Sequence, residues 1–210
     1  GDLVEPRTPM RQRIAHHMSP SRRTSAHVTS FFEIDLTRVA RIRAKQRAAV
    51  EASTGYKLSY LPFIISAVVD GLRKFPIMNA AVSGNNIIYR KQYNIGIAVA
   101  LDWGLIVPVI KKADDLSLSG LTRALNDLAS RARAKKLDPR EVQDGTFTIT
   151  NPGIFGSVMG TPIISQPQVA ILGLGAIDKR PKVITGLDGE DTIAIRTCAF
   201  FSISFDHRII

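Results

Sequence analysis

The sequence predicts a single α/β domain, an α+β two-layer sandwich in which a mixed β-sheet carries helices on one face. Its 210 residues, 45% of them hydrophobic, are enough to form one domain with its own hydrophobic core but too few for two domains of typical size. Segments with helical periodicity alternate with short apolar segments of strand character. The single cysteine, Cys198, stands in an apolar run, which predicts a buried thiol without a disulfide partner.

The composition also limits the cellular setting. No run approaches the ~18 apolar residues that a membrane span needs, and the N-terminus lacks the order of a signal peptide. We therefore expect a cytoplasmic protein, or one of the mitochondrial matrix in a eukaryote, without a membrane partner. The net charge of +10 admits a polyanionic partner. Nucleic acid is disfavoured, because only 7% of the residues are aromatic and no recognition motif is present.

The N-terminal segments predict a helix, a loop and a strand. Thr8 followed by Pro9 is typical of a helix start, and apolar residues then recur at helical spacing, so a helix is expected at about 9–18. A polar loop is expected at 19–26. Alternation over 28–36 predicts a strand.

Two consecutive helices are predicted after this strand. Thr37 is expected to cap a basic helix at 37–52, which Gly55 terminates. Ser59 is expected to open a second, more apolar helix that closes before Pro76. The apolar composition of the second helix predicts that it is buried.

The remaining segments predict strands around one further helix. A turn at 83–86 lies between strands, two apolar runs within 93–110 belong to a sheet, and Ser117 caps an amphipathic helix that covers one face of that sheet. Three last strands are expected at about 146–150, 169–174 and 192–206, interrupted by the Gly/Pro-rich loop 151–168 and the turn 186–189.

His207 stands at the tip of the last predicted strand. It has the parity of the apolar residues from Ala199 to Phe205, which places its imidazole at the edge of an apolar surface. Burial there favours the neutral ring, which can accept a proton. The pattern alone still favours a structural histidine, because a lone histidine lacks the partners of a catalytic group. Asp206 and Arg208 point to the other face, where a structural ion pair is expected.

Four segments carry a resemblance to a known family: HVTSFFEIDLT at 27–37, GLIVPVI at 104–110, FTITNPGIFGSVMGTPIISQPQVAILGLGAI at 147–177 and FDHRII at 205–210. Together they resemble the catalytic domain of the dihydrolipoamide acyltransferases of 2-oxo acid dehydrogenase complexes. The resemblance implies a chloramphenicol-acetyltransferase-like fold, a catalytic domain at 7–210, and the end of an interdomain linker at 1–6. Because the family signature continues with Asp-Gly, it also implies that the domain is truncated before this pair and a terminal helix.

The resemblance implies two catalytic residues, His207 and Thr150. A thiol is only a few per cent thiolate at neutral pH, and His207 would remove its proton as the general base. Attack on a thioester carbonyl puts negative charge on oxygen, which the Thr150 hydroxyl would stabilise. Without the resemblance, Thr150 would be an ordinary strand threonine. In the family the site lies between two subunits of a homotrimer, with the histidine and the hydroxyl donor on different chains.

Coenzyme A is the cofactor that the resemblance implies, as a substrate, with lipoamide carried on a separate lipoyl domain. Arg43 and Ser59 match residues of the coenzyme A site in branched-chain members, and Asn151 matches a further contact. A basic helix around Arg43 suits a ligand with several phosphate charges, although a solvated helix face is an equal alternative. Gly175 completes the predicted cofactor-binding set and stands where succinyl-transferring members carry a histidine.

The predicted function is reversible acyl transfer between dihydrolipoamide and coenzyme A, with an acetyl or branched-chain acyl group and succinyl as a further option. Trimers would build a cubic or icosahedral core, with the 2-oxo acid dehydrogenase and dihydrolipoamide dehydrogenase components as partners. The alternatives are an assembly core without turnover and another coenzyme A-dependent acetyltransferase of the same fold. No metal is expected, because His16, His17 and His27 lack acidic or cysteine partners at ligand spacing.

Overall fold

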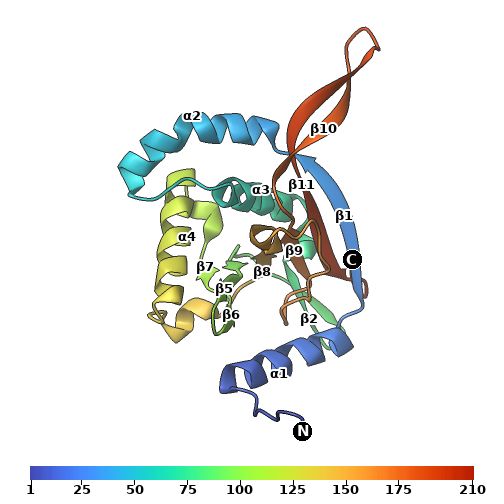
Figure 1. Cartoon of the computed structure of the whole chain (residues 1–210). Coiled ribbons are helices and arrows are strands. Elements are labelled where there is room, and N and C mark those ends of the chain that lie inside the picture. The colour runs from blue at the N-terminus through green and yellow to red at the C-terminus, as the bar shows by residue number, and fades with distance from the viewer.

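Seven strands form one mixed sheet in the computed structural model, which describes residues 1–210 (Figure 1). They are β1 (His27–Asp35), β4 (Ile95–Ile97), β7 (Val109–Ile110), β8 (Phe147–Thr150), β9 (Ala170–Leu174), β10 (Asp178–Thr185) and β11 (Asp191–Asp206). The order is β1-β11-β9-β8-β4-β7, and β10 pairs with β11. Because β8 runs parallel to β4 and β9 while the other pairs are antiparallel, the predicted mixed sheet is confirmed.

Four α-helices accompany the sheet: α1 (Pro9–Thr24), α2 (Thr37–Thr54), α3 (Leu61–Lys74) and α4 (Leu118–Arg133). The main core lies where α3 and α4 cover the sheet, and it includes Ile65, Leu121 and Phe147. This confirms the prediction that the apolar helix, α3, is buried and that the amphipathic helix, α4, covers one face of the sheet. Figure 1 shows α1 apart from the other helices, near the opposite end of β1 from α2.

Short elements complete the fold. Two small sheets pair β2 (Ala80–Ser83) with β3 (Asn86–Tyr89) and β5 (Val99–Leu101) with β6 (Gly104–Ile106). The 3₁₀ helices are η1 (Pro76–Asn79), η2 (Ala113–Asp115), η3 (Pro139–Val142) and η4 (Pro152–Phe155). No helix is both long enough and apolar enough to cross a bilayer. Cys198 is fully buried, as predicted, and burial raises the pKa of its thiol.

The first helix is longer than the sequence predicted. It was expected to end at about residue 18, but α1 continues to Thr24 through Pro20. Proline removes one intrahelical hydrogen bond, and tertiary contacts offset this loss. The buried Ser21 hydroxyl donates to the Ile164 carbonyl at 2.5 Å, and the Gln166 amide donates to Ser21. The predicted loop at 19–26 is therefore mostly helical.

The start of α2 also differs from the prediction. Leu36, not Thr37, occupies the N-cap position, and it has no side-chain capping bond. The Thr37 hydroxyl instead accepts a hydrogen bond from the Thr197 amide at 2.9 Å, which ties the helix to β11. The predicted terminator is confirmed, because Gly55 adopts the left-handed conformation with φ of 76°. Ser117 caps α4 as predicted.

The sequence analysis missed β10. Its segment, DKRPKVIT, is polar and contains Pro181, two features that argue against a strand. The strand forms because it pairs along the first half of β11, from Asp178 opposite Cys198 to Thr185 opposite Asp191. Its other edge is unpaired, so the proline costs no ladder hydrogen bond.

The β10–β11 hairpin projects from the body of the protein (Figure 1). One face of it carries Val183, Ile193 and Ile195, which we call the hairpin stripe. Val183 lies directly opposite Ile193, and Ile195 shares the parity of Ile193. Their exposed fractions are 64%, 80% and 73%. Three neighbouring aliphatic side chains are thus left facing solvent in the single chain.

Candidate functional site

Thr150 ends β8 and lines a cavity of about 320 Å³. The sheet forms the wall of this cavity, because Thr150 is in register with Gly173 of β9, and Gly173 is in register with Ser202 of β11. None of the lining residues carries a charge. The full lining is Met18, Ala98, Leu105, Val107, Thr148, Thr150, Pro152, Gly160, Thr161, Pro162, Ile163, Ser165, Ile171, Gly173 and Ser202.

The hydroxyl groups on this wall differ in their hydrogen bonding. Thr148 donates to the Gln168 side chain at 2.7 Å, and the Ser202 hydroxyl lies 3.5 Å from the Gly173 carbonyl. The Thr150 hydroxyl has no partner within the chain, so it is free to donate to a bound group. Sequence reasoning missed Ser202, although the alternation of Ser202 and Ser204 with apolar residues in β11 could have indicated a second buried face.

His207 lies outside this cavity, in the turn that follows β11. Its backbone N–H donates to the Ala26 carbonyl at 2.8 Å, and its Nδ1 lies 2.6 Å from the Ile210 carbonyl. Since only a protonated Nδ1 can donate to that carbonyl, Nε2 is the nitrogen left to accept a proton. The ring packs against Phe205 on one side but is otherwise exposed, so the expected apolar surroundings are not found within one chain.

The structure does not bring His207 and Thr150 together within one chain. In the sheet, Thr150 is level with Ser202, and His207 follows Ser202 by five residues. At about 3.3 Å per residue this is a separation of about 17 Å along the strand alone. A site that uses both side chains must therefore combine two chains.

The predicted ion pair beside His207 is confirmed. Asp206 is 1% exposed, and its carboxylate lies 2.7 Å from the Arg208 guanidinium. Burial raises the pKa of Asp206, but hydrogen bonds from Arg208, Ser25 and the Ala26 N–H outweigh burial and lower the pKa to about 2. This buried carboxylate fixes the turn that presents the imidazole.

Replacing Asp206 with asparagine should therefore destabilise the protein at neutral pH by about 2 kcal/mol, the equivalent of its pKa depression. The carboxylate contributes this stability above its ordinary pKa of 3.8, and the contribution is lost as pH falls towards about 2. Urea unfolding at several pH values should show the difference between wild type and variant shrinking below pH 4. A constant difference would mean that the charge is not responsible.

Arg43 and Ser59 are brought together, because Arg43 binds the segment that contains Ser59. The Arg43 Nε donates to the Leu58 carbonyl at 2.8 Å, and the guanidinium lies 4.8 Å from the centre of the Tyr60 ring. Arg43 is thus partly buried rather than a freely solvated side chain. Its terminal nitrogens make no hydrogen bond within the chain and could contact a phosphate. Asn151 lies elsewhere, directly after Thr150 and at the start of η4.

Gly175 is buried, and packing explains why it is a glycine. A Cβ atom there would lie 1.9 Å from the Val158 carbonyl oxygen and 2.8 Å from that of Phe200. The Gly175 amide donates to the Phe200 carbonyl at 2.7 Å, so it is already used within the chain. The predicted contact with a cofactor stays a prediction that this geometry does not favour. The histidine of succinyl-transferring members would not fit here without movement of the backbone at Val158.

Changing Gly175 to alanine should lower the free energy of unfolding by at least about 2 kcal/mol, because the backbone on both sides would have to move. Gly160 provides the control, since a Cβ there would meet no atom within 4 Å and its φ is not positive. Its alanine variant should remain within about 0.5 kcal/mol of wild type in urea unfolding. Equal stabilities of the two variants would contradict the packing argument.

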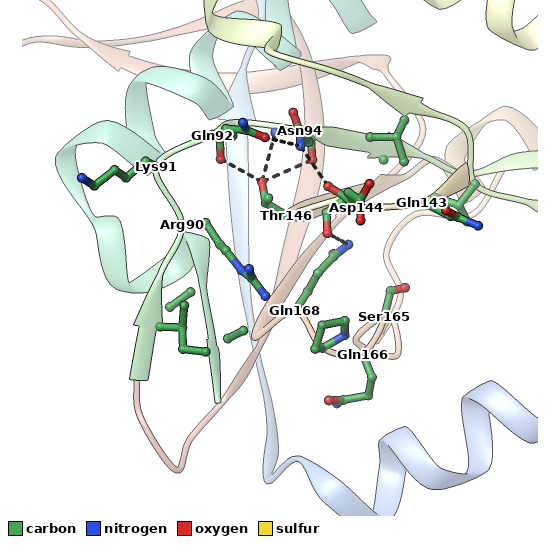
Figure 2. Close-up of a pocket in the computed structure, with 18 of the residues that line it drawn as sticks. Arg90, Lys91, Gln92, Asn94, Gln143, Asp144, Thr146, Ser165, Gln166 and Gln168 are labelled. Atoms are coloured by element: carbon green, nitrogen blue, oxygen red, sulfur yellow. Dashed lines mark hydrogen bonds between the residues drawn. The ribbon is translucent and has the colours of Figure 1, made fainter. Parts of the chain in front are cut away.

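A larger cavity of about 650 Å³ holds none of the predicted site residues (Figure 2). Its buried polar side chains are hydrogen-bonded to backbone groups of neighbouring segments: the Asn94 side-chain amide donates to the Asp144 backbone carbonyl at 3.0 Å, and the Asn94 backbone N–H donates to the Thr146 hydroxyl at 3.1 Å. Figure 2 shows this network linking Gln92, Asn94, Asp144 and Thr146. These bonds attach the segment before β8 to the segment before β4, which is a structural role.

No group of three histidine, cysteine, aspartate or glutamate side chains is placed to hold an ion. His27 has the packing role that the sequence analysis considered: its Nδ1 is 3.0 Å from the Ser25 carbonyl, and its Nε2 accepts from the Ile164 N–H at 3.0 Å. His27 therefore joins β1 to the loop that closes the cavity around Thr150.

Comparison with solved structures supports this architecture. A probable dihydrolipoamide acetyltransferase from Listeria monocytogenes has a TM-score of 0.94 and 40% identity over 100% of this chain and 88% of its own. The dihydrolipoamide acetyltransferase of Azotobacter vinelandii has a TM-score of 0.93 and 35% identity over 100% of this chain and 85% of its own. That structure was studied for the role of a serine, a histidine and an asparagine in its catalytic mechanism. A chloramphenicol acetyltransferase, at 15% identity and a TM-score of 0.56, covering 93% of this chain and 86% of its own, confirms the expected fold alone.

Sequence comparison shows the family. The succinyltransferase component of the 2-oxoglutarate dehydrogenase complex of Bacillus subtilis is 42% identical over 95% of this chain and 47% of its own length. The acetyltransferase component of the pyruvate dehydrogenase complex of Mycobacterium tuberculosis is 41% identical over 96% of this chain and 37% of its own. The chain thus spans half or less of the length of these relatives. The profile of the 2-oxoacid dehydrogenases acyltransferase (catalytic domain) matches residues 2–210, and the chain belongs to this family.

Proposed function

We propose that the protein transfers an acyl group between dihydrolipoamide and coenzyme A in a 2-oxo acid dehydrogenase complex. The observation that carries this proposal is the unpartnered Thr150 hydroxyl on the wall of an uncharged cavity. Such a hydroxyl can donate to an oxygen that becomes negative during the reaction. Membership of the acyltransferase family supports the same reaction.

The chemistry needs a base and an oxyanion donor. His207 accepts the thiol proton at Nε2, and the thiolate attacks the thioester carbonyl. The Thr150 hydroxyl donates a hydrogen bond to the carbonyl oxygen while it carries negative charge. When the tetrahedral intermediate collapses, the carbon–sulfur bond to the first carrier breaks, and the departing thiolate takes the proton from His207. The acyl group has then changed carriers, and the base is regenerated.

A homotrimer that assembles into a larger core fits this chemistry. His207 and Thr150 are separated within one chain, so a second copy must supply one of them. The exposed hairpin stripe offers an apolar surface for such a contact. A solved structure similar to this chain is the cubic core of a pyruvate dehydrogenase multienzyme complex, with a TM-score of 0.92 and 35% identity over 100% of this chain and 85% of that one. The dehydrogenase components of a 2-oxo acid dehydrogenase complex are the partners we propose, in the cytoplasm or the mitochondrial matrix.

Coenzyme A would use Arg43 and Ser59, with Asn151 nearer the reacting atoms. Replacing Arg43 with alanine should raise the KM for coenzyme A about tenfold, the loss expected for one charge-assisted hydrogen bond. Arg41, which is exposed on the same helix, provides the matched control, and its alanine variant should keep the wild-type KM. Because Arg43 also binds the Leu58 carbonyl, urea unfolding must accompany the kinetics. If the Arg43 and Arg41 variants have the same KM for coenzyme A, Arg43 does not bind this substrate.

Acyl transfer from acetyl-, isobutyryl- and succinyl-coenzyme A to free dihydrolipoamide tests the proposal directly. A rate that depends on dihydrolipoamide supports it. Transfer to a hydroxyl acceptor instead would indicate another acetyltransferase of the same fold. A folded oligomer without transfer to either acceptor would leave only the assembly role.

A further inference from the structure

We infer that Ser25 is a positioning residue for two active sites at once, because it holds both the turn that carries His207 and the wall of the cavity that contains Thr150. The inference rests on the proposed function. His207 and Thr150 of one chain are too far apart to share a site, so these two segments belong to two different sites of the assembly. A change at Ser25 should therefore affect both sites.

The turn of His207, residues 206–210, is attached to the segment that follows α1. The Ala26 N–H donates to the Asp206 carboxylate at 3.2 Å, and the His207 N–H donates to the Ala26 carbonyl at 2.8 Å. The Ser25 side chain also hydrogen-bonds to Asp206, which is 1% exposed. The position of the imidazole thus depends on where Ser25 and Ala26 place these groups.

The wall of the cavity is attached to the same segment through Ile164. The Ile164 N–H donates to the His27 Nε2 at 3.0 Å, and the Ile164 carbonyl accepts from the Ser21 hydroxyl at 2.5 Å. Ile164 is fully buried, and its neighbours Ile163 and Ser165 line the cavity. Because both backbone groups of Ile164 are held from 21–27, this segment sets the position of the wall.

These two sets of hydrogen bonds meet at Ser25. Its hydroxyl accepts from the Gln166 side-chain amide at 2.8 Å, and Gln166 belongs to the loop 151–168, which we call the cavity loop. Ser25 is 6% exposed, so removing its hydroxyl leaves buried partners unsatisfied. Ser21 is also buried, but its hydroxyl bonds only to the cavity loop, at Ile164 and Gln166. Comparing the two serines therefore separates a residue that serves both segments from one that serves the loop alone.

The kinetic test supplies the two halves of a site from different chains. In a doubly tagged oligomer of His207→Ala and Thr150→Val chains, each complete site takes its hydroxyl donor from the first chain and its base from the second. Ser25→Ala is introduced into either chain in turn. In the chain that supplies His207, it should lower kcat about tenfold, because the base is displaced during the chemical step. In the chain that supplies Thr150, it should raise the KM for the acyl-coenzyme A donor about tenfold, the loss of one buried hydrogen bond.

Ser21→Ala provides the matched control, since it removes a buried hydroxyl two turns or less from the same segment end but not a bond to Asp206. It should raise KM when carried by the chain that supplies Thr150 and leave kcat unchanged when carried by the chain that supplies His207. An effect of Ser25→Ala in only one of the two chains, or in neither, would overturn the inference.

Hydrogen exchange tests the same link without turnover. Peptides covering 160–168 and 204–210 should both exchange faster in Ser25→Ala, whereas only 160–168 should do so in Ser21→Ala. If Ser25→Ala does not assemble, Gln166→Ala replaces it, because this side chain is exposed and its amide binds Ser25. Unchanged exchange at 204–210 would overturn the inference. Faster exchange of both segments in a protein without transfer activity would uphold the link and sink the proposed function instead.

Discussion

Replacing His207 with alanine should lower kcat for acyl transfer by about 10³-fold, because the variant lacks the base that we propose takes the thiol proton. The thiol would then react only through the small fraction of thiolate present in solution. Steady-state transfer to dihydrolipoamide, with enzyme concentration raised to follow the residual rate, measures the effect.

The loss should be confined to catalysis. The His207 side chain is exposed, lies at hydrogen-bond distance from the Ile210 carbonyl and packs against the Phe205 ring, so removing it should leave folding and oligomeric state unchanged. His17, exposed on α1, gives the control, and its alanine variant should keep full activity. A His207→Ala protein that retains more than a tenth of the wild-type kcat would show that His207 is not the base.

Mixing two inactive variants should restore activity if each site combines two chains. Thr150→Val removes the proposed oxyanion donor and should lower kcat about 10²-fold, whereas Thr150→Ser should keep most of the activity. A subunit with His207→Ala still supplies Thr150, and a subunit with Thr150→Val still supplies His207. In equal random mixtures, half of the histidine donors and half of the hydroxyl donors are intact, so about a quarter of the sites are complete.

Co-expression of the two variants with different tags, followed by purification on both, provides the mixed oligomer. Its rate should far exceed that of either variant alone, whereas the two proteins mixed without subunit exchange should show only their summed rates. If the doubly tagged oligomer is no more active than its components, His207 and Thr150 do not act in one shared site.

Local signals predicted most of the fold where the determinants are close in sequence. Ser117 and Gly55 mark helix ends by capping chemistry that involves only near neighbours. The errors occur where distant residues decide. The helix through Pro20 depends on contacts with Ile164 and Gln166, and the polar strand β10 exists because β11 is long enough to pair with it.

The site could be predicted only in part for the same reason. The resemblance pointed to Thr150 and His207. The register of β8, β9 and β11 places these two residues far apart in one chain, and this separation cannot be predicted from the local sequence around either residue. The neutral lining of the cavity combines segments from Met18 to Ser202. Gly175 was assigned to the cofactor site because of its position in a motif, whereas its close approach to the Val158 carbonyl is a property of the folded backbone.

The projecting β10–β11 hairpin should make the local stability of this protein depend on its concentration. A two-stranded ribbon is only marginally stable by itself in water, and the outer part of β10 and β11 receives no support from the core. Copies that cover the hairpin stripe would hold these strands in place, so by mass action the ordered form would gain stability as concentration rises. On dilution, the ribbon would fray first, and exchange of its amide hydrogens would report dissociation before the sheet around Thr150 opens.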